Sequence, residues 1–331
     1  MLRNAYRMGL AVAALFAVSG AASGAAAADK AHLQLDWIPT GEHAAYFAGW
    51  QKGMWEKHGI EITMSRGYGS GDTIAKLAGG AADFGVADIA AVFTGRQRTQ
   101  TPVKAISAVY THSPHSLFVL KKSGIADFKG LEGKKIGITP GNSHKLYFPN
   151  VAARAGTDPE KIVWVNTDAS AMAAMLITGR IDAAPFYSIH HYYQNKAAVR
   201  AGEEIAVLPF EKTGFTIYAA SLVTTDEMIA NKPDLTKRFL AGAWDSFKWA
   251  KDNQKEACEL HVKKNPEVDV DDCMGSLKAT MGFVFNDHSE KTGFGRFDPE
   301  RLKYTWEVVA ASQDMPKDWN YAQAVDTSLL P

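Results

Sequence analysis

Side chains suited to holding a small, flat molecule cluster near the start of the chain. Asp36 and Trp37 follow a short apolar run, and His43 and Tyr46 come shortly afterwards. Indole and phenol rings offer faces for stacking or for a cation, while a carboxylate and an imidazole supply hydrogen bonds. Pro39 cannot lie inside a central strand, so we predict a strand that ends at about Trp37. Open α/β sheets bind ligands at this end of their strands, which predicts a ligand site here.

A glycine-rich loop at residues 67–73 precedes another predicted helix. Ser70 and Gly71 bring backbone N–H groups to the start of that helix, a position that favours an anion or a hydrogen-bond acceptor. The loop lacks the lysine of a P-loop, which argues against a nucleoside triphosphate. An ordinary helix cap by Ser70 or Asp72 explains the same residues, and both interpretations stay open.

The second half of the chain contains a similar arrangement. Asn142 and Ser143 can donate and accept hydrogen bonds at the start of a predicted helix, and Tyr187 follows a predicted strand as an aromatic wall. Packing of Tyr187 on the adjacent helix is the alternative. Asp88 and Tyr110, near the ends of two other predicted strands, complete the candidate ligand-binding residues.

The histidines form no recognisable metal or catalytic motif. His190 and His191 are adjacent, so on a helix their side chains point about 100° apart. We expect them and His58 to be surface or hydrogen-bonded residues, whereas His112 and His115 could face a cleft. The sequence has no Gly-x-Ser-x-Gly or His-Glu-x-x-His motif and no cysteine nucleophile motif. We therefore predict no enzyme activity, no metal and no cofactor.

The chain has two cysteines, Cys258 and Cys273. In an oxidising compartment the leading interpretation is a disulfide that links two C-terminal helices, which would stabilise the protein by roughly 3 kcal/mol. Two buried thiols are the alternative. Two cysteines without a histidine at metal spacing do not make a zinc site.

Residues 1–28 have the pattern of a secretory signal peptide. Arg3 and Arg7 precede the apolar run Gly9–Val18, and Ala26–Ala28 form a small-residue cleavage site. This predicts an exported, periplasmic protein. The chain has 36 Lys and Arg against 36 Asp and Glu residues and no basic stripe, which argues against a nucleic-acid partner.

Predicted strands and helices alternate after the signal peptide, as in α/β proteins with parallel sheets. Strands near residues 32–36, 60–65, 84–87 and 103–109 form one doubly wound lobe with the helices between them. The pattern restarts at residue 116, and a helical tail follows residue 225, including a predicted long helix from Pro233 to about Lys263. We predict two doubly wound lobes joined by crossover strands at 116–120 and 215–222, with the C-terminal helices packed on lobe 1.

Several short motifs, taken in order, resemble one known family. Leu35-Asp36-Trp37 with Pro39, His43 and Tyr46 begins the series, which continues at 69–71, 81–85, 128–137 and 178–184. Together they resemble the NMT1/THI5-like substrate-binding proteins of ABC importers. The resemblance implies a type II periplasmic binding protein, expected to be a monomer, that closes on one small-molecule solute and delivers it to an ABC permease in the inner membrane. It implies lobe 1 at residues 29–116 and 217–331 and lobe 2 at residues 117–216.

Members of this family bind thiamine pyrimidine precursors, riboflavin, or alkanesulfonates and taurine. For a pyrimidine, the resemblance assigns stacking to Trp37; family members tend to carry an acid near residues 187–190, which this chain lacks. We expect an aromatic or nitrogen-heterocyclic solute. The alternatives are a sulfonate or an aromatic carboxylate, with Ser70, Gly71, Asn142 and Ser143 as donors for the sulfonate. A pyrimidine synthase is less favoured, since the cysteine-rich iron-binding motif of those relatives is missing.

Overall fold

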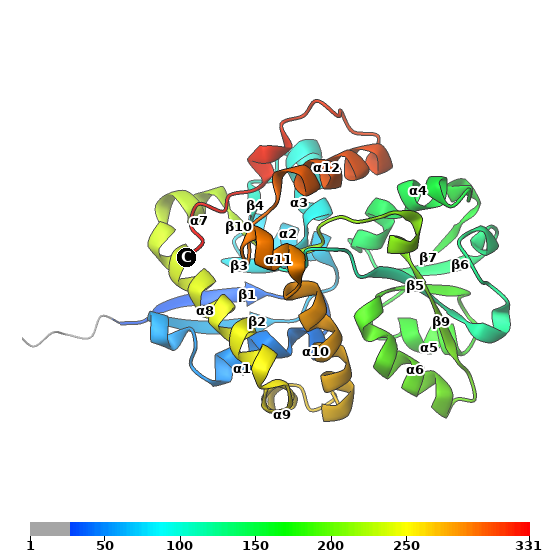
Figure 1. The fold of residues 1–331 in the computed structure, drawn as a ribbon, viewed down its shortest axis with the longest axis horizontal. Helices are drawn as coiled ribbons and strands as arrows, with labels where there is room; N and C mark the ends of the chain where they lie inside the picture. Colours follow the sequence, from blue (N-terminus) through cyan, green and yellow to red (C-terminus); the bar gives the residue numbers. More distant parts are fainter. Residues whose placement is uncertain (1–26) are drawn as a thin grey trace, which may run out of the picture.

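The computed structural model describes residues 27–331 of the chain, so the predicted signal peptide lies almost wholly outside the described residues. The described chain forms two sheets of five strands each, set in separate halves of the molecule (Figure 1). We call the half built on the first sheet lobe 1 and the half built on the second sheet lobe 2. The residue boundaries predicted for the lobes stay predictions.

The two sheets follow the same plan. In lobe 1 the order is β2-β1-β3-β10-β4, with β10 antiparallel to both of its neighbours. Its strands are β1 (Asp29–Gln34), β2 (Ile60–Ser65), β3 (Phe84–Asp88), β4 (Val103–Ala108) and β10 (Ala220–Thr225). In lobe 2 the order is β7-β6-β8-β5-β9, with β5 antiparallel to its neighbours. Its strands are β5 (His115–Leu120), β6 (Lys135–Ile138), β7 (Val163–Asn166), β8 (Ala183–Tyr187) and β9 (Ile205–Pro209).

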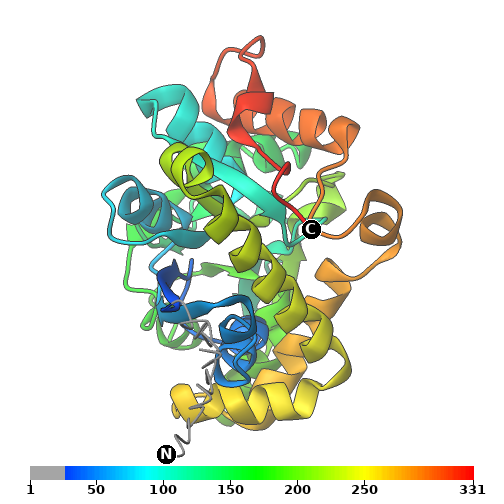
Figure 2. The same cartoon turned by 90° about the vertical axis from the view of Figure 1, so that its left-hand side faces the viewer.

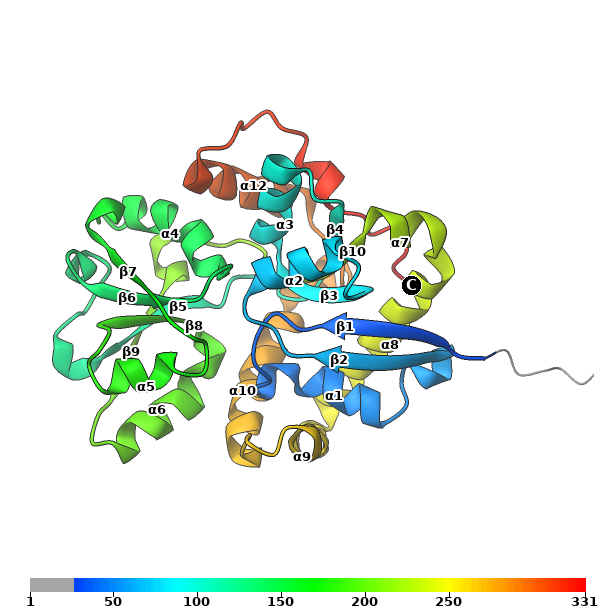
Figure 3. The ribbon, with the colours of Figure 1, turned by 180° about the vertical axis from the view of Figure 1, so that it is seen from behind.

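Helices cover both sheets and then form the C-terminal part of the chain (Figures 1 and 3). In the α/β part they are α1 (Ala44–Gln51), α2 (Ser70–Ala78), α3 (Ile89–Thr99), α4 (Ser143–Arg154), α5 (Met172–Ile177) and α6 (His191–Arg200). After β10 they are α7 (Asp226–Asn231), α8 (Pro233–Asp252), α9 (Gln254–Lys264), α10 (Val270–Val284), α11 (Asp287–Thr292) and α12 (Pro299–Gln313). Short 3-10 turns include η1 (Gly41–His43) and η6 (Ser188–His190). None of the helices among residues 27–331 is long and apolar enough to cross a membrane.

Two helices that the sequence predicted as continuous are interrupted. The helix predicted from residue 233 to residue 263 is wrong as a single element, because Asn253 leaves helical geometry (φ −126°) and separates α8 from α9. Its side chain donates to the Trp249 carbonyl at 2.9 Å and so caps the end of α8. The sequence also predicts one helix at about residues 42–58, but this segment consists of η1, α1 and a further 3-10 turn, with Gly53 at φ +65° after α1.

The C-terminal helices pack mainly on lobe 1, but two of them also reach lobe 2. Figure 2 shows α8 crossing the face of lobe 1. Helix α10 lies between the lobes in Figures 1 and 3, and its Ser276 hydroxyl donates to the Ile189 carbonyl of η6 at 2.9 Å. Helix α12 packs Trp306 edge-on against Phe93 of α3, while its Gln313 amide donates to the Leu146 carbonyl of α4. These helices therefore tie the two lobes together behind the cleft.

The second crossover differs from the predicted strand at 215–222. The strand begins only at Ala220, and residues 214–219 are irregular. Phe215 and Ile217 are nevertheless fully buried, since this segment packs inside the larger apolar core. The apolar, β-branched and aromatic residues that predicted a strand are thus explained by burial.

Candidate ligand-binding site

A cavity lies between the lobes, where the carboxyl ends of their parallel strands face each other. From lobe 1 its wall is formed by Asp36, Trp37, Glu42, Gly69 and Ser70; from lobe 2 it is formed by Asn142, Ser143, His144, Pro185, Phe186, Tyr187 and His190. The wall thus combines residues after β1 and β2 with residues after β6 and at the end of β8. This is the position at which open α/β sheets bind ligands.

The lobes touch beside the cavity through three glycines, which we call the glycine seam (Gly69, Gly71 and Gly141). The Gly71 N–H donates to the Gly141 carbonyl at 3.0 Å, and the Thr139 hydroxyl donates to the Tyr68 carbonyl at 3.2 Å. A Cβ on Gly71 would lie 2.9 Å from the Gly141 Cα. Backbone therefore meets backbone here, which requires residues without side chains. The predicted site residue Gly71 lies at this seam and not on the cavity wall.

Trp37 lies on the wall with its ring packed against lobe 2. It is buried in the apolar cluster that contains Met172 and Phe186, both from lobe 2. Its indole Nε1 is buried without a hydrogen-bond partner. On the other side Tyr187, also buried, makes edge contacts with His115 at 4.9 Å and Tyr110 at 6.1 Å between ring centroids. Trp37 and Tyr187 thus supply the aromatic surface of the cavity.

Asp36 and His43 form a buried pair at one end of the wall. The imidazole Nε2 of His43 lies 3.2 Å from Asp36 Oδ1. Burial raises the pKa of Asp36 above its usual value. Burial alone would lower the pKa of His43, but the Glu42 and Asp36 carboxylates outweigh it and raise that pKa. His43 therefore lies behind the wall and holds Asp36 in place.

Glu42 is a cavity residue that the sequence analysis missed. His190 Nε2 donates to Glu42 Oε1 at 2.7 Å, and the Tyr110 hydroxyl donates to Glu42 Oε2 at 3.3 Å. Burial alone would raise the pKa of Glu42, but its electrostatic interactions with His190 and His43 and these hydrogen bonds lower it to about 2. Glu42 precedes Tyr46 by one helical turn, a spacing that places both on one face and could have identified it.

His190 was expected to be an ordinary surface or hydrogen-bonded residue. It is hydrogen-bonded, but it is also buried and lines the cavity. The acid that the family resemblance led us to seek near residues 187–190 is therefore replaced by a histidine, and Glu42 from the opposite lobe contacts it. A local sequence pattern cannot predict such a pair, because the two residues are far apart in the chain and meet only in the folded protein.

Asp88 lies behind the cavity, at the junction of both lobes. Its Oδ1 accepts from the Tyr147 hydroxyl of α4 at 2.5 Å and from the Ala90 N–H at 2.8 Å. His115 Nε2 lies 3.3 Å from Asp88 Oδ2 and 3.0 Å from the Ser143 hydroxyl. Burial raises the pKa of Asp88 to about 7. His115 is fully buried and is not on the cavity wall.

The remaining predicted residues divide between capping and support. The hydroxyl of Ser70 accepts from the Asp88 N–H, and the Asn142 side chain caps α4 by accepting from the His144 N–H. Both also line the cavity. The alternative that Ser70 or Asp72 caps the following helix is wrong, because the N-cap of α2 is Gly69 and no side chain caps that helix. Tyr46 and Tyr110 lie behind the wall, Tyr46 with its ring edge-on to Phe247 at 4.9 Å. Within residues 27–331, no group of three or more His, Cys, Asp or Glu side chains is arranged to hold a metal ion.

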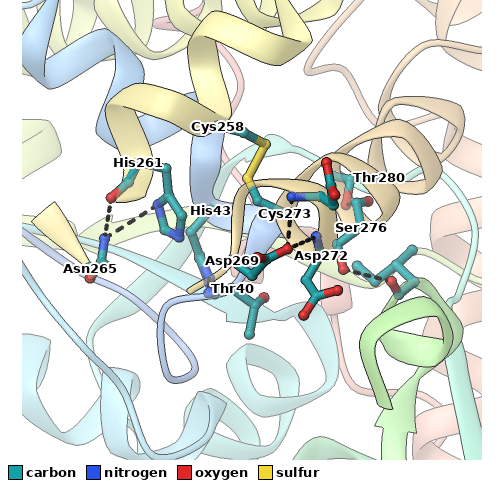
Figure 4. The surroundings of a disulfide bond; sticks show 12 residues. Thr40, His43, Cys258, His261, Asn265, Asp269, Asp272, Cys273, Ser276 and Thr280 are labelled. Carbon is teal, nitrogen blue, oxygen red and sulfur yellow. Dashed lines mark hydrogen bonds between the residues drawn. A yellow bond between two sulfur atoms is a disulfide. The ribbon is translucent and has the colours of Figure 1, made fainter. Parts of the chain in front are cut away.

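Cys258 and Cys273 form a disulfide that joins α9 to α10 (Figure 4). The predicted bridge between C-terminal helices is present in the structure. Cys273 lies against η1, since a Cβ on Gly41 would lie 2.3 Å from the Cys273 carbonyl oxygen. The disulfide therefore lies directly behind the turn that carries Glu42 and His43.

Comparison with known proteins identifies the family. The family model described as "NMT1/THI5 like" matches residues 40–257. The chain belongs to the NMT1/THI5-like family. Among similar members, the riboflavin-binding protein RibY of Chloroflexus aurantiacus is 24% identical, over 90% of this chain and 85% of RibY. The 4-amino-5-hydroxymethyl-2-methylpyrimidine phosphate synthase of Schizosaccharomyces pombe is 24% identical, over 64% of this chain and 63% of the synthase.

Solved structures share the fold of this NMT1/THI5-like protein. The alkanesulfonate-binding protein SsuA of Xanthomonas axonopodis pv. citri, bound to MOPS, superposes with a TM-score of 0.73 at 14% identity. The match covers 91% of this chain and 99% of SsuA. The predicted fold class, a type II periplasmic binding protein with two α/β lobes, is thereby confirmed. The relatives named above differ in function, since one is a riboflavin-binding protein and the other a pyrimidine phosphate synthase.

Proposed function

We propose that this protein is a periplasmic receptor that binds one small, flat, uncharged or cationic nitrogen heterocycle and delivers it to an ABC permease. One observation carries the proposal. The cavity has aromatic faces from Trp37 and Tyr187 and the carboxylates of Asp36 and Glu42, and no lysine or arginine of the described chain lines it. Aromatic faces and buried carboxylates together favour flat or cationic ligands.

The charge of the wall decides between ligand classes. A sulfonate in this cavity would lie close to two buried carboxyl groups, and repulsion between like charges is strong where water is excluded. In favour of a sulfonate, the N-termini of α2 and α4 meet the cavity at Ser70 and Ser143, and helix N-termini attract anions. Their partial charges are smaller than those of the carboxylates, so we place the sulfonate second.

The tight contact between the lobes favours a compact solute. Trp37 and Tyr187, which face the cavity from opposite lobes, are both buried. A single, thiamine-pyrimidine-like ring requires less separation of the lobes than the tricyclic ring and ribityl chain of riboflavin. We also propose that the protein has no enzyme activity, because its polar wall residues are held in pairs and the sequence offers no nucleophile motif.

Binding would proceed by closure of the two lobes. A solute that touches Trp37 from lobe 1 and Tyr187 from lobe 2 favours the state in which both surround it. The glycine seam then supplies the backbone contact that completes the closed form. Closed receptor is the form that we expect the permease to accept.

A ligand screen tests the proposal. The mature protein is unfolded and refolded to remove carried-over solute, then heated with aminopyrimidines, riboflavin, taurine and other sulfonates, and aromatic acids. A ligand at about 100 times its Kd adds roughly 2.7 kcal/mol to the free energy of unfolding, which raises the melting temperature visibly. A rise with single-ring nitrogen heterocycles supports the proposal. A rise with sulfonates alone contradicts it and favours the alternative.

A further inference from the structure

Two residues that line the cavity each have a buried polar atom without a hydrogen-bond partner. These atoms are the indole Nε1 of Trp37 and the imidazole Nδ1 of His190. Both residues line the cavity, and each is more than nine-tenths buried. Buried polar atoms are paired in the great majority of cases, so unpaired ones on a ligand cavity indicate where a ligand supplies the missing partner. One of these atoms belongs to each lobe.

Glu42 determines how the His190 ring is held. Glu42 Oε1 accepts from His190 Nε2 at 2.7 Å, so Nε2 carries a proton. The Tyr110 hydroxyl donates to the other oxygen of Glu42. Both oxygens are thus engaged with protein groups, and the ring nitrogen left for a solute is Nδ1. In the neutral ring with Nε2 protonated, Nδ1 is a hydrogen-bond acceptor.

Helix α10 supports both members of this pair, which we call the Glu42–His190 pair. Gly41, next to Glu42, packs on the Cys273 carbonyl, where a side chain has no room. Ile189, next to His190, accepts from the Ser276 hydroxyl one turn further along the same helix. A single helix therefore fixes the turn that carries Glu42 and the turn that carries His190. The positions of Glu42 and His190 are therefore fixed by the packing of their turns on α10, and not only by the contact between their side chains.

We infer that His190 is the specificity-determining residue of lobe 2: Glu42 holds it as the Nε2–H tautomer, and its Nδ1 accepts an N–H group of the solute. Trp37 Nε1 donates to an acceptor on the same solute. The inference rests on the proposed function and narrows its ligand class. The solute carries an amino group for His190 and a separate acceptor atom for Trp37. Glu42 acts through His190 and is a positioning residue.

A matched pair of probes tests this inference. The probes are 4-amino-5-hydroxymethyl-2-methylpyrimidine and its 4-oxo counterpart, in which a carbonyl acceptor replaces the amino donor. Calorimetric titration of the refolded mature protein near pH 7 measures both affinities. A site built to receive a donor rejects an analogue that lacks it, so we expect the amino probe to bind at least about tenfold more tightly.

Two variants separate recognition from folding. His190→Phe keeps a ring of similar shape without nitrogen, and we expect the preference between the probes to shrink to about threefold or less. In Glu42→Gln the amide can donate to Nε2, which moves the ring proton to Nδ1, so we expect the preference to shift towards the oxo probe. Glu61→Gln, an exposed acid on β2, serves as the control and should leave the preference unchanged. Thermal melts verify that each variant folds.

Each outcome bears on the inference. Loss of the preference in His190→Phe with a shift in Glu42→Gln supports it. An unchanged preference in folded His190→Phe, or a wild-type preference for the oxo probe, overturns it while the proposed function stands, since a flat heterocycle still binds. Binding of sulfonates only, or of neither probe, overturns the inference together with the proposed pyrimidine-like solute.

Discussion

Trp37 belongs to lobe 1 in sequence and to the apolar cluster of lobe 2 in space. Its ring is therefore buried by closure of the cleft and contributes little to the core of its own lobe. Trp37→Ala should weaken solute binding by about 100-fold or more, because an aromatic surface that contacts the ligand is removed. Calorimetric titration with the solute found by the screen measures this loss.

The control for Trp37 is Trp50→Ala on α1, a partly buried indole that lies under Lys264 and away from the cavity. We expect this variant to bind normally. Equal affinity of Trp37→Ala and wild type would contradict the assignment of the aromatic wall.

Asp88 gives the stability of the protein a defined pH dependence. Its pKa is raised from 3.8 to about 7, so the folded protein holds a proton that the unfolded chain has already lost. Between about pH 4 and pH 7 the folded state binds more protons, and the free energy of unfolding falls as the pH rises. The whole effect amounts to up to about 4 kcal/mol. Asp88→Asn should flatten this slope, as measured by urea unfolding at several pH values.

The pH experiment has a matched control in Asp252→Asn, since Asp252 is exposed at the end of α8. The groups that face Asp88 are Tyr147 of α4, Ala90 of α3 and His115 of β5, and none of them is changed by either substitution. A slope for Asp88→Asn that equals that of wild type would show that this carboxyl is ionised in the folded protein.

At the scale of single residues, the sequence predicted several residues that line the cavity but not the charge pairs among them. Trp37 and Tyr187 were predicted from strand ends, and both line the cavity. Glu42 and His190 were passed over, because each alone looks like an ordinary polar residue at a helix start. Glu42 and His190 form a pair only through a contact between residues 148 positions apart, which no local sequence pattern reveals.

At the scale of elements, α10 connects the disulfide to the cavity. It receives the Cys258–Cys273 bridge on one side and supports η1 and η6 on the other. Reduction, or the double variant Cys258→Ala and Cys273→Ser, should lower the free energy of unfolding by roughly 3 kcal/mol. Because α10 positions Glu42 and His190, solute affinity should fall as well.

Calorimetry with and without a reducing agent measures the first effect, and titration of the reduced protein measures the second. The double variant, treated with the same reductant, is the control, since it should show no further change. Full solute affinity in the reduced protein would show that α10 holds its place without the bridge.

Element boundaries were predicted well where periodicity and capping coincide. Strand β2 and helix α10, which the sequence predicts at about residues 60–65 and 270–284, have the predicted limits, with alternating burial in the strand and an Asp269 cap on the helix. The break between α8 and α9 was missed because Asn253 lies in an otherwise helical pattern. Its capping contact depends on the side-chain conformation, which composition does not reveal.

At the scale of the whole molecule, closure depends on the glycine seam. Gly71→Ala places a methyl group where the Gly141 backbone lies, so the lobes cannot approach fully. We expect solute affinity to fall about tenfold or more and the decrease in radius of gyration on binding to disappear, while each lobe stays folded. Small-angle scattering with and without solute measures the change.

Gly282→Ala on α10 is the matched control, because a Cβ there meets nothing within 4 Å. It should bind and close as wild type does. A Gly71→Ala protein that still contracts on binding would show that the seam is not required for closure.

The two-lobe plan followed from the sequence because the strand and helix pattern restarts after residue 116, and it is confirmed. Local sequence patterns do not reveal how closely the two lobes approach each other. The loop at 67–73 and the residues Asn142 and Ser143 were each predicted at helix starts, yet the contact between Gly71 and Gly141 depends on how two separate cores are oriented.

The seam also has a consequence for the rate at which solute leaves. Side chains change rotamer within nanoseconds, so a gate made of side chains would let small solutes escape more quickly than large ones. At the glycine seam the contact is backbone on both sides, and it opens only when whole lobes separate, a motion of microseconds to milliseconds. The dissociation rates of tightly and weakly bound solutes that fit the closed cavity should therefore have the same upper limit. That limit is the rate at which the lobes open.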